Sequence, residues 1–447
     1  MTSPRVAVIG AGLAGLSAGV ALRQAGAHVE VFERKRILGG KATSFTVDGV
    51  EVDNGQHVVL GCCTAFLDFI DSLGMRSALH MQPRFEVRVL ARGARPARLA
   101  ASWLPAPLHL AASFARYPHL RTRDKFRVAQ ALLAARKQQR SGGDMATWLA
   151  RRGQTVAARR AFWDPFLVPA LNAPLEQVAA ADGLFVINTA FSSSRGAARI
   201  GYATVPLARV AETAARQLDA VHKRSPVIGL ERDGAHVMAL RTESERRDDF
   251  DAFVVAIPPE RLAALLGDAT AYGLNGLESF RNQPIVDVHL WYDVAENSAP
   301  LLGDAGFAAL LDSPVQWVFE KGRGYLCCSM SAAGDAVTRP ESELVARCDA
   351  ELRDVIPSLR ASRRVRGAAT RDPDATFVPT PGLVRPGPRT ACDNLVIAGA
   401  WTDTGWPATM ESAVRSGRAA AHDVLRVSKT VRETRTTRPV EEPVGAV

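Results

Sequence analysis

Residues 5–33 constrain the fold of this chain most, because they have the pattern of a strand, a glycine-rich turn, a helix and a second strand. Val6-Ala7-Val8-Ile9 is a short apolar run typical of a buried parallel strand, and Gly10-Ala11-Gly12-Leu13-Ala14-Gly15 follows it directly. Apolar residues then recur at helical spacing, and a second apolar run ends at Glu33. This order predicts a βαβ unit at the N-terminus and an α/β protein.

Three glycines and one acidic residue of this unit predict a nucleotide site. Gly10 allows a tight turn, Gly12 lets a phosphate approach the backbone, and Gly15 lets the helix pack closely on the strand. The first amides of the helix and its dipole attract a diphosphate. A carboxylate at Glu33 accepts hydrogen bonds from ribose hydroxyls and repels a 2′-phosphate. The predicted contacts are made by Gly10, Gly12, Leu13, Ala14, Gly15 and Glu33.

The net charge of +9 over 447 residues comes from a single segment. Residues 84–160 hold 17 Lys and Arg against three Asp and Glu, a local charge of +14, whereas the remainder of the chain carries −5. The protein is therefore a mildly acidic body with one basic insert. No recognisable nucleic-acid-binding module accompanies the charge, so we expect no nucleic-acid partner.

The cysteines predict a reduced protein of the cytoplasm. The six cysteines include two adjacent pairs, Cys62-Cys63 and Cys327-Cys328, and neighbouring cysteines do not easily bridge each other. No CxxC spacing indicates a metal site, and the N-terminus has no secretory pattern. No run approaches the roughly 18 apolar residues of a membrane span. We expect a chain that is soluble or lies on a surface.

Residues 394–417 have a second pattern of strand, loop and helix. A buried strand ends at Gly399, a polar loop follows, and Pro407 suits the first turn of a helix that we expect to continue through Leu425. The N-terminal amides of this helix would face an anionic acceptor.

Together with residues 34–41, these motifs resemble the flavin amine oxidase and carotenoid desaturase superfamily. The resemblance implies FAD as the cofactor, with the C-terminal helix at the N1–C2 carbonyl edge of the flavin. Relatives commonly have Arg in place of Lys41 and an acid in place of Ala400; Asp403 would substitute for that acid only if its loop folds back. The resemblance assigns further cofactor contacts to Arg34, Lys35, Gly39, Gly40, Lys41, Gly55, Gln56, His57, Val227, Gly399, Trp401, Asp403, Ala408, Thr409 and Met410.

Four other segments narrow the resemblance to the squalene-associated FAD-dependent desaturases, which are hydroxysqualene dehydroxylases. They are residues 53–61, 162–174, 284–293 and 316–319, and their most specific motifs are Asp-Asn-Gly-Gln-His and Leu-Asn-Ala-Pro. The implied reaction is FAD-dependent reductive dehydroxylation of hydroxysqualene to squalene in isoprenoid and hopanoid biosynthesis. Loss of the protonated hydroxyl leaves an allylic cation, and N5 of the reduced flavin delivers a hydride to it.

This reaction needs a proton donor, and His57, Asp164 and Asp53 are the candidates. His57 is best placed by its motif, and its pKa can lie near neutrality. A structural histidine that bonds to the backbone is an equal alternative. Asp164, directly before Pro165, is also explained by a turn.

The expected architecture is a Rossmann-like FAD-binding domain interleaved with an α+β substrate domain, in which a mixed sheet carries a helical cap, as in amine oxidases. We assign residues 1–82, 200–262 and 388–427 to the FAD domain. Residues 83–199 and 263–387 form the substrate domain, with a basic helical insert at 84–160. Residues 428–447 are polar and are expected to be a disordered tail.

The basic insert predicts a membrane partner. Residues 103–140 combine apolar and aromatic residues with Lys and Arg, as interfacial helices do. We expect peripheral docking on the inner face of the cell membrane, a C30 isoprenoid substrate and association with other squalene-pathway enzymes. An ordinary helical lid with a solvated basic face is the alternative.

Two other functions remain open. A carotenoid (phytoene-type) desaturase or flavin amine oxidase shares the fold, although Thr409 and Met410 stand where amine oxidases often have an aromatic residue. A catalytically silent, membrane-associated flavoprotein is supported only by Ala400.

Overall fold

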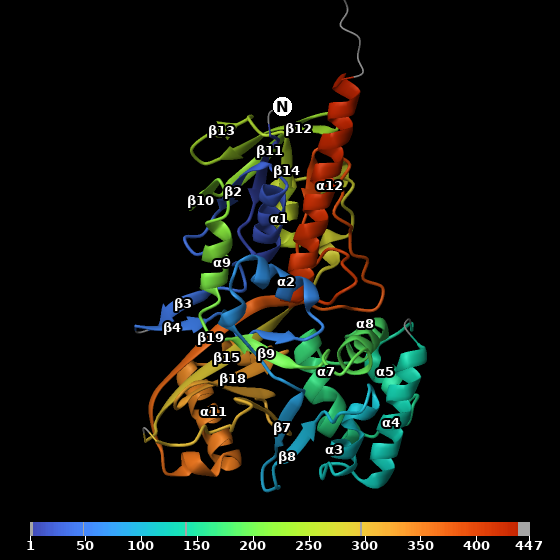
Figure 1. Cartoon of the computed structure of the whole chain (residues 1–447), viewed down its shortest axis with the longest axis vertical. Coiled ribbons are helices and arrows are strands. Elements are labelled where there is room, and N and C mark those ends of the chain that lie inside the picture. The colour runs from blue at the N-terminus through green and yellow to red at the C-terminus, as the bar shows by residue number, and fades with distance from the viewer. Residues whose placement is uncertain (1–2, 48, 139–140, 296, 437–447) are drawn as a thin grey trace, which may run out of the picture.

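The protein has two lobes stacked along its long axis, each built around its own sheet (Figure 1). The computed structural model describes residues 3–47, 49–138, 141–295 and 297–436. The predicted α/β architecture, with a nucleotide-type lobe and a mixed-sheet lobe, is confirmed. Within these ranges, none of the helices has both the length and the apolar character needed to cross a bilayer.

The upper lobe contains a five-stranded parallel sheet with the strand order β10-β2-β1-β14-β20. Its strands come from four distant parts of the chain, and the apolar runs are buried because both faces are covered. They are β1 (Arg5–Ile9), β2 (His28–Glu33), β10 (Ala220–Lys223), β14 (Ala252–Val255) and β20 (Leu395–Ile397).

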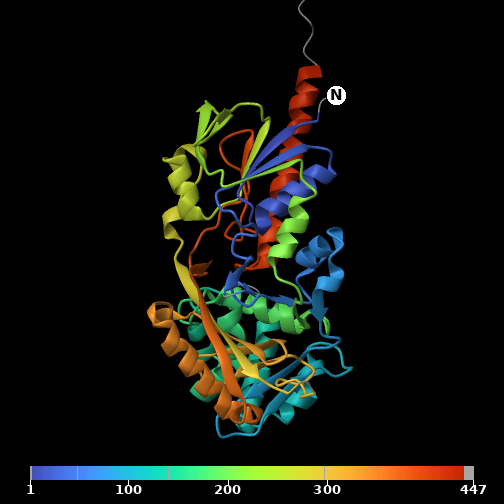
Figure 2. The same ribbon diagram turned by 90° about the vertical axis from the view of Figure 1, so that its left-hand side faces the viewer.

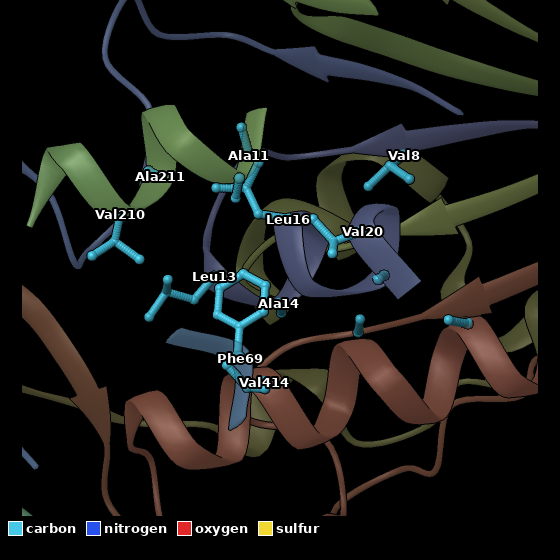
Figure 3. Packing of buried hydrophobic residues seen from close by; sticks show 14 of the residues in the cluster. Val8, Ala11, Leu13, Ala14, Leu16, Val20, Phe69, Val210, Ala211 and Val414 are labelled. Carbon is cyan, nitrogen blue, oxygen red and sulfur yellow. The ribbon is translucent and has the colours of Figure 1, made fainter. Parts of the chain in front are cut away.

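One face of this sheet is covered by four helices: α1 (Leu13–Gln24), α2 (Thr64–Ser72), α9 (Ala208–Ala215) and α12 (Met410–Thr436). Figure 3 shows α1 between α9 and α12: Leu16 lies toward Val210 and Ala211, and Phe69 and Val414 lie beside Leu13 and Ala14. The opposite face is covered by α10 (Pro259–Leu266) and a small sheet of β11 (Val227–Asp233), β12 (His236–Thr242) and β13 (Arg246–Arg247).

The lower lobe contains a seven-stranded mixed sheet with the order β19-β15-β18-β17-β16-β7-β8. Only β16 and β7 pair in parallel; the other neighbours are antiparallel. The strands are β7 (Glu86–Leu90), β8 (Ala97–Ala100), β15 (Asn282–Asp293), β16 (Phe307–Leu310), β17 (Trp317–Gly322), β18 (Tyr325–Ser331) and β19 (Arg363–Phe377). Figure 2 shows β15 and β19 as long strands that reach from the lower lobe toward the upper one.

Helices cover both faces of the lower sheet. The helix α11 (Glu341–Val355) packs on one face. The cap on the other side consists of α3 (Ala111–Ala115), α4 (Thr122–Lys137), α5 (Met145–Ala150), α6 (Val156–Ala158), α7 (Asp164–Leu171) and α8 (Ala180–Val186). Two small sheets lie between the lobes: β3 (Ser44–Val47) with β4 (Val50–Asp53), and β5 (Val58–Leu60) with β9 (Ile200–Ala203) and β6 (Leu79–Met81).

Two features of the predicted domain assignment need correction. The insert 84–160 is not helical throughout, because its first part forms β7 and β8, whose apolar residues alternate with arginines. The boundary at 262/263 cuts α10, and Tyr272, Leu274 and Leu277 beyond it share the hydrophobic cluster of the upper sheet. The remaining domain limits stay predictions.

The predicted disordered tail is wrong over its first part, because α12 continues to Thr436. No Gly or Pro interrupts residues 428–436, so a helix that is already nucleated and packed can extend through them. Residues 437–447 lie outside the described residues.

Candidate functional site

The loop between β1 and α1 combines two closely packed glycines with one that faces open space. A Cβ on Gly10 would lie 2.5 Å from the carbonyl oxygen of Ala256, and a Cβ on Gly15 would lie 2.0 Å from that of Gly10. A Cβ on Gly12 would meet nothing nearer than the Cα of Gly40, at 4.0 Å. The backbone at Gly12 is thus open to a ligand, while its neighbours are fixed by packing.

The second glycine pair packs directly on this loop. The amide of Gly39 donates a 2.9 Å hydrogen bond to the carbonyl of Ala11, and a Cβ on Gly40 would lie 3.0 Å from the Cα of Gly12. Gly39 and Gly40 have φ values of +100° and +64°, which favour glycine. The ammonium of Lys41 turns to β19 instead, where it donates to the carbonyl of Asp374 and lies 3.6 Å from the carboxylate of Asp372.

Glu33 is fixed at the carboxyl end of β2. One carboxylate oxygen accepts a 2.9 Å hydrogen bond from the amide of Ala11, and the other accepts a 2.8 Å hydrogen bond from the amide of Lys35. Each oxygen retains a second lone pair for a hydroxyl donor. Arg34 and Lys35 are exposed directly beside it.

Two helix N-termini meet at this edge of the sheet. Because α1 follows β1 and α12 follows β20 in one parallel sheet, both helices begin at the carboxyl ends of the strands. Gly12 precedes α1 and provides no side-chain cap, whereas Thr409 accepts the amide of Ser412 at the start of α12. Their orphan amides and dipoles favour negative charge at two points along one ligand.

The loop 399–407 places Trp401 and Asp403 in different surroundings. The Trp401 indole is buried in the core and donates to the carbonyl of Ile257 at 3.0 Å. Asp403 is exposed and accepts from the amide of Gly405 at 3.3 Å. The loop therefore does not fold Asp403 back to replace the missing acid at Ala400. Val227 begins β11 and is half-buried against the core of the upper lobe.

Arg385 holds this loop in place, and sequence reasoning missed it. Its guanidinium donates to the carbonyls of Ala400 at 2.9 Å, Trp401 at 3.1 Å and Trp406 at 2.7 Å, and also to that of Thr402. Burial lowers the pKa of Arg385. Nothing in the local proline-rich sequence indicates this role, because the arginine lies 15 to 21 residues along the chain from the carbonyls it binds.

The segment Asp53–His57 lies where the two lobes meet. The amide of Gln56 donates to Oδ1 of Asp287 on β15 at 3.3 Å, and Nδ1 of His57 donates to the carbonyl of Gly55 at 3.1 Å. Gly55 has a φ of +94°. Residues 53–57, which form the Asp-Asn-Gly-Gln-His motif, are therefore a strip of chain that lies against the lower sheet.

Two of the three candidate acids are engaged in structural contacts. Asp53 accepts from Ser44 at 2.7 Å and from the amide of Leu207 at 2.9 Å, and it forms an ion pair with Lys321 at 3.2 Å. Asp164 begins α7 and forms an ion pair with Arg159 at 3.4 Å. Burial raises the pKa of Asp164, against the effect of Arg159.

His57 keeps the backbone contact that its structural alternative predicts. Loss of hydration lowers the pKa of His57, against the opposing effect of Asp53. The ring is therefore neutral at pH 7. Because Nδ1 carries the proton given to Gly55, Nε2 is an acceptor.

A cavity of about 640 Å³ opens between the lobes beside Asp53. Its wall includes Tyr202 of β9, Lys321 of β17 and Tyr325 of β18. It lies along the lower sheet and does not include the glycine loops.

The arrangement of the upper lobe fits FAD. The open backbone at Gly12 and the uncapped start of α1 suit a diphosphate, Glu33 suits a ribose, and the start of α12 lies further along the same edge. The fold and this site define an FAD-dependent oxidoreductase.

Comparisons with known proteins agree with this class. The family model described as flavin containing amine oxidoreductase matches residues 13–425. The hydroxysqualene dehydroxylase of Rhodopseudomonas palustris is 30% identical over 96% of this chain and 100% of its own length. The 15-cis-phytoene desaturase of Synechococcus elongatus is 24% identical over 98% of this chain and 99% of its own.

Solved structures show the same fold. A double mutant of putrescine oxidase superposes with a TM-score of 0.72 at 17% identity, covering 95% of this chain and all of the other. The chain belongs to the flavin containing amine oxidoreductase family, and it is similar to hydroxysqualene dehydroxylases over nearly its whole length. The predicted family, amine-oxidase-like fold and FAD cofactor are thereby confirmed.

Proposed function

We propose that this chain catalyses the reductive dehydroxylation of hydroxysqualene to squalene. The observation that carries the proposal is the resemblance to three hydroxysqualene dehydroxylases, each 27–30% identical over more than nine-tenths of this chain. The carotenoid desaturases match at lower identity, between 23% and 25%. FAD, when bound and reduced, supplies the hydride that replaces the hydroxyl.

The chain must provide a proton, hold the isoprenoid and keep water from the allylic cation. Aromatic rings of the cap and the lower sheet would help to hold the isoprenoid and to keep water from the cation. Trp317 lies 6.0 Å from Phe166 and 6.0 Å from Phe307 between ring centroids, and Phe166 lies 6.0 Å from Phe162. Such faces attract a cation without offering it a nucleophile.

Asn172 ties this cap to the sheet. It ends α7 with a φ of 49°, and its side chain bonds to the backbone of Gln283 and Ala332. The Leu-Asn-Ala-Pro motif therefore supports a cap held at a defined place on the sheet.

Membrane docking remains part of the proposal. The outward stripe of α4 carries exposed Phe126 and Leu133 among basic residues, and Trp103 is 81% exposed in the segment before α3. Apolar side chains flanked by cations suit an anionic bilayer, where a C30 isoprenoid is stored. Association with other squalene-pathway enzymes stays a prediction.

The test is anaerobic turnover of hydroxysqualene by chemically reduced holoenzyme, with squalene measured by mass spectrometry. We expect one squalene per flavin in a single turnover. In parallel, the oxidised protein is mixed with phytoene and with putrescine. Flavin bleaching by either, without squalene from hydroxysqualene, would assign a desaturase or amine oxidase. Absence of all three reactions from a flavin-loaded protein would support the silent flavoprotein.

A further inference from the structure

The strand β15 carries two ionisable residues on a buried face. Val286, Val288 and Leu290 alternate with Asp287 and His289, and the three apolar residues pack with α11. Asp287 is 1% exposed and His289 is 2% exposed. Valine would fit an apolar core at both positions, so core packing alone does not explain the ionisable side chains of Asp287 and His289.

Asp287 faces the strip of chain at the junction of the lobes. Its Oδ1 accepts from the amide of Gln56 at 3.3 Å and from the thiol of Cys327 at 3.9 Å. A Cβ on Gly55 would lie 3.3 Å from its Oδ2. Only glycine at this point lets the Asp-Asn-Gly-Gln-His strip approach the carboxyl so closely.

The neighbours of Asp287 on the sheet are weakly polar. In the strand register it lies between Thr370 of β19 and Ser329 of β18, and Trp317 of β17 is opposite Ser329. Asp287 is thus in line with the aromatic residues proposed to surround the isoprenoid, about two strand spacings from Trp317, or roughly 10 Å.

Burial is the dominant influence on this carboxyl. It raises the pKa of Asp287 to about 6, and hydrogen bonds from Ser329 and Gln56 and the ammonium of Lys321 oppose the rise. The charged or titratable groups packed around this region are Asp53 and His57 of the crossing strip, Lys321 of β17, Tyr325 and Cys327 of β18, His289 of β15 and Asp372 of β19. Lys321 is already paired with Asp53 at 3.2 Å.

We propose that Asp287 is the catalytic residue that protonates the leaving hydroxyl of the isoprenoid substrate. The proposal rests on the proposed function. Asp53 and Asp164 are less suited to donate the proton because they form ion pairs, and His57 is less suited because its Nε2 carries no proton.

The O–H proton of Asp287 passes to the hydroxyl oxygen of the substrate, and the C–O bond breaks with both electrons leaving on that oxygen as water. Reduced FAD supplies the two electrons and the hydrogen that complete squalene. The carboxylate of Asp287 regains a proton from solvent before the next turnover.

The experiment compares Asp287→Asn with the wild-type holoenzyme on hydroxysqualene and on its acetate ester, whose leaving group needs no proton. Asp349→Asn is the matched control, because that carboxylate accepts from Tyr292 on the opposite face of β15. We expect Asp287→Asn to lower kcat at least about 100-fold on the alcohol but less than about 5-fold on the ester. The kcat of the wild type should fall as pH rises above about 6, because the acid must be protonated, and the variant should lose this limb.

A second readout does not depend on turnover. Infrared difference spectra of the oxidised holoenzyme should contain a protonated carboxyl band that titrates near pH 6 and is absent from Asp287→Asn. If Asp287→Asn fails to fold, Asp287→Glu, which keeps an acid, should retain activity on the alcohol and a shifted carboxyl band.

Equal losses on alcohol and ester, or a carboxyl band unchanged by the substitution, overturn the role of Asp287. A wild-type enzyme that makes no squalene from either substrate overturns the proposed function instead, and the infrared band still decides whether Asp287 holds the proton.

Discussion

The side-chain oxygen of Asn172 accepts a 2.6 Å hydrogen bond from the amide of Ala332, and both residues have a φ of 49°. The same side chain donates to the carbonyl of Gln283 at 3.0 Å and to the hydroxyl of Thr376 at 2.9 Å. One buried amide thereby joins the end of α7 to β15, to β19 and to the residue that follows β18.

We predict that Asn172→Ala destabilises the protein by about 3 kcal/mol, because it leaves buried donors and acceptors unpaired and removes a residue that tolerates a left-handed φ. Urea unfolding measures the effect. The exposed Asn275→Ala is the control and should change stability by less than about 0.5 kcal/mol. Similar stability in the two variants would contradict a joining role for Asn172.

Gly417 sets the distance between α12 and α1. A Cβ there would lie 2.2 Å from the carbonyl oxygen of Ala14 and 2.8 Å from the amide of Ala18. Gly417→Ala should cost about 1–3 kcal/mol and should lower the flavin content, because it separates the two helices whose N-termini serve the cofactor.

The control for this prediction is Gly19→Ala on α1. Its Cβ would meet side chains and no backbone, with Leu218 at 3.2 Å and Val29 at 3.5 Å, and alanine favours the helix. Flavin content is read from absorbance near 450 nm, a general property of oxidised flavin. Normal flavin loading in Gly417→Ala would show that the helix spacing does not control cofactor binding.

If the protein docks on a membrane, two exposed aromatic residues should contribute to its binding to anionic vesicles. Trp103 and Phe126 are 81% and 65% exposed, and changing both to serine should weaken binding to phosphatidylglycerol vesicles at least about tenfold. Val156→Ser, at a residue 74% exposed outside 103–140, is the matched control. Co-sedimentation measures both, and equal binding of the two variants would contradict docking through this surface.

The buried carboxyl of Asp287 should also lower the free energy of unfolding at neutral pH, compared with an uncharged side chain at the same position. Its pKa of about 6 in the folded protein exceeds the ordinary value of 3.8, so the folded state binds the proton more tightly. The resulting stability is present at low pH and is lost as pH rises from about 4 to above 6.

We therefore expect Asp287→Asn to unfold at a higher temperature than the wild type at pH 8, with a gain of up to about 3 kcal/mol, and to show a smaller gain at pH 4. Calorimetry at the two pH values measures the difference. A gain that does not depend on pH would contradict a raised pKa.

The sequence predicted the nucleotide lobe well because its signals are local. The glycine loop, Glu33 and the pair Gly39-Gly40 lie within one βαβ unit and its extension, where spacing alone constrains the backbone. A helix after the loop 399–407 was predicted for the same reason, although it begins at Met410 and Pro407 lies before its first turn. The role of Asp403 was not, because the direction of a loop depends on what clamps it, and Arg385 does so from outside the motif.

The surroundings of the candidate acids could not be predicted from the sequence either. The alternation of apolar and polar residues in Pro284–Asp293 indicates a strand with one polar face, but it does not say whether that face meets water or another lobe. Asp53 looked available in the sequence, yet Lys321 lies 268 residues further along the chain and neutralises it.

By itself the sequence determined the fold class, the family and the backbone cradle for FAD, because each depends on residues close together in the chain. Only the tertiary structure decided that Asp287 is buried and what it faces. Asp287 meets Gln56 across 231 positions of sequence, and the pKa of a carboxyl depends on what surrounds it in space.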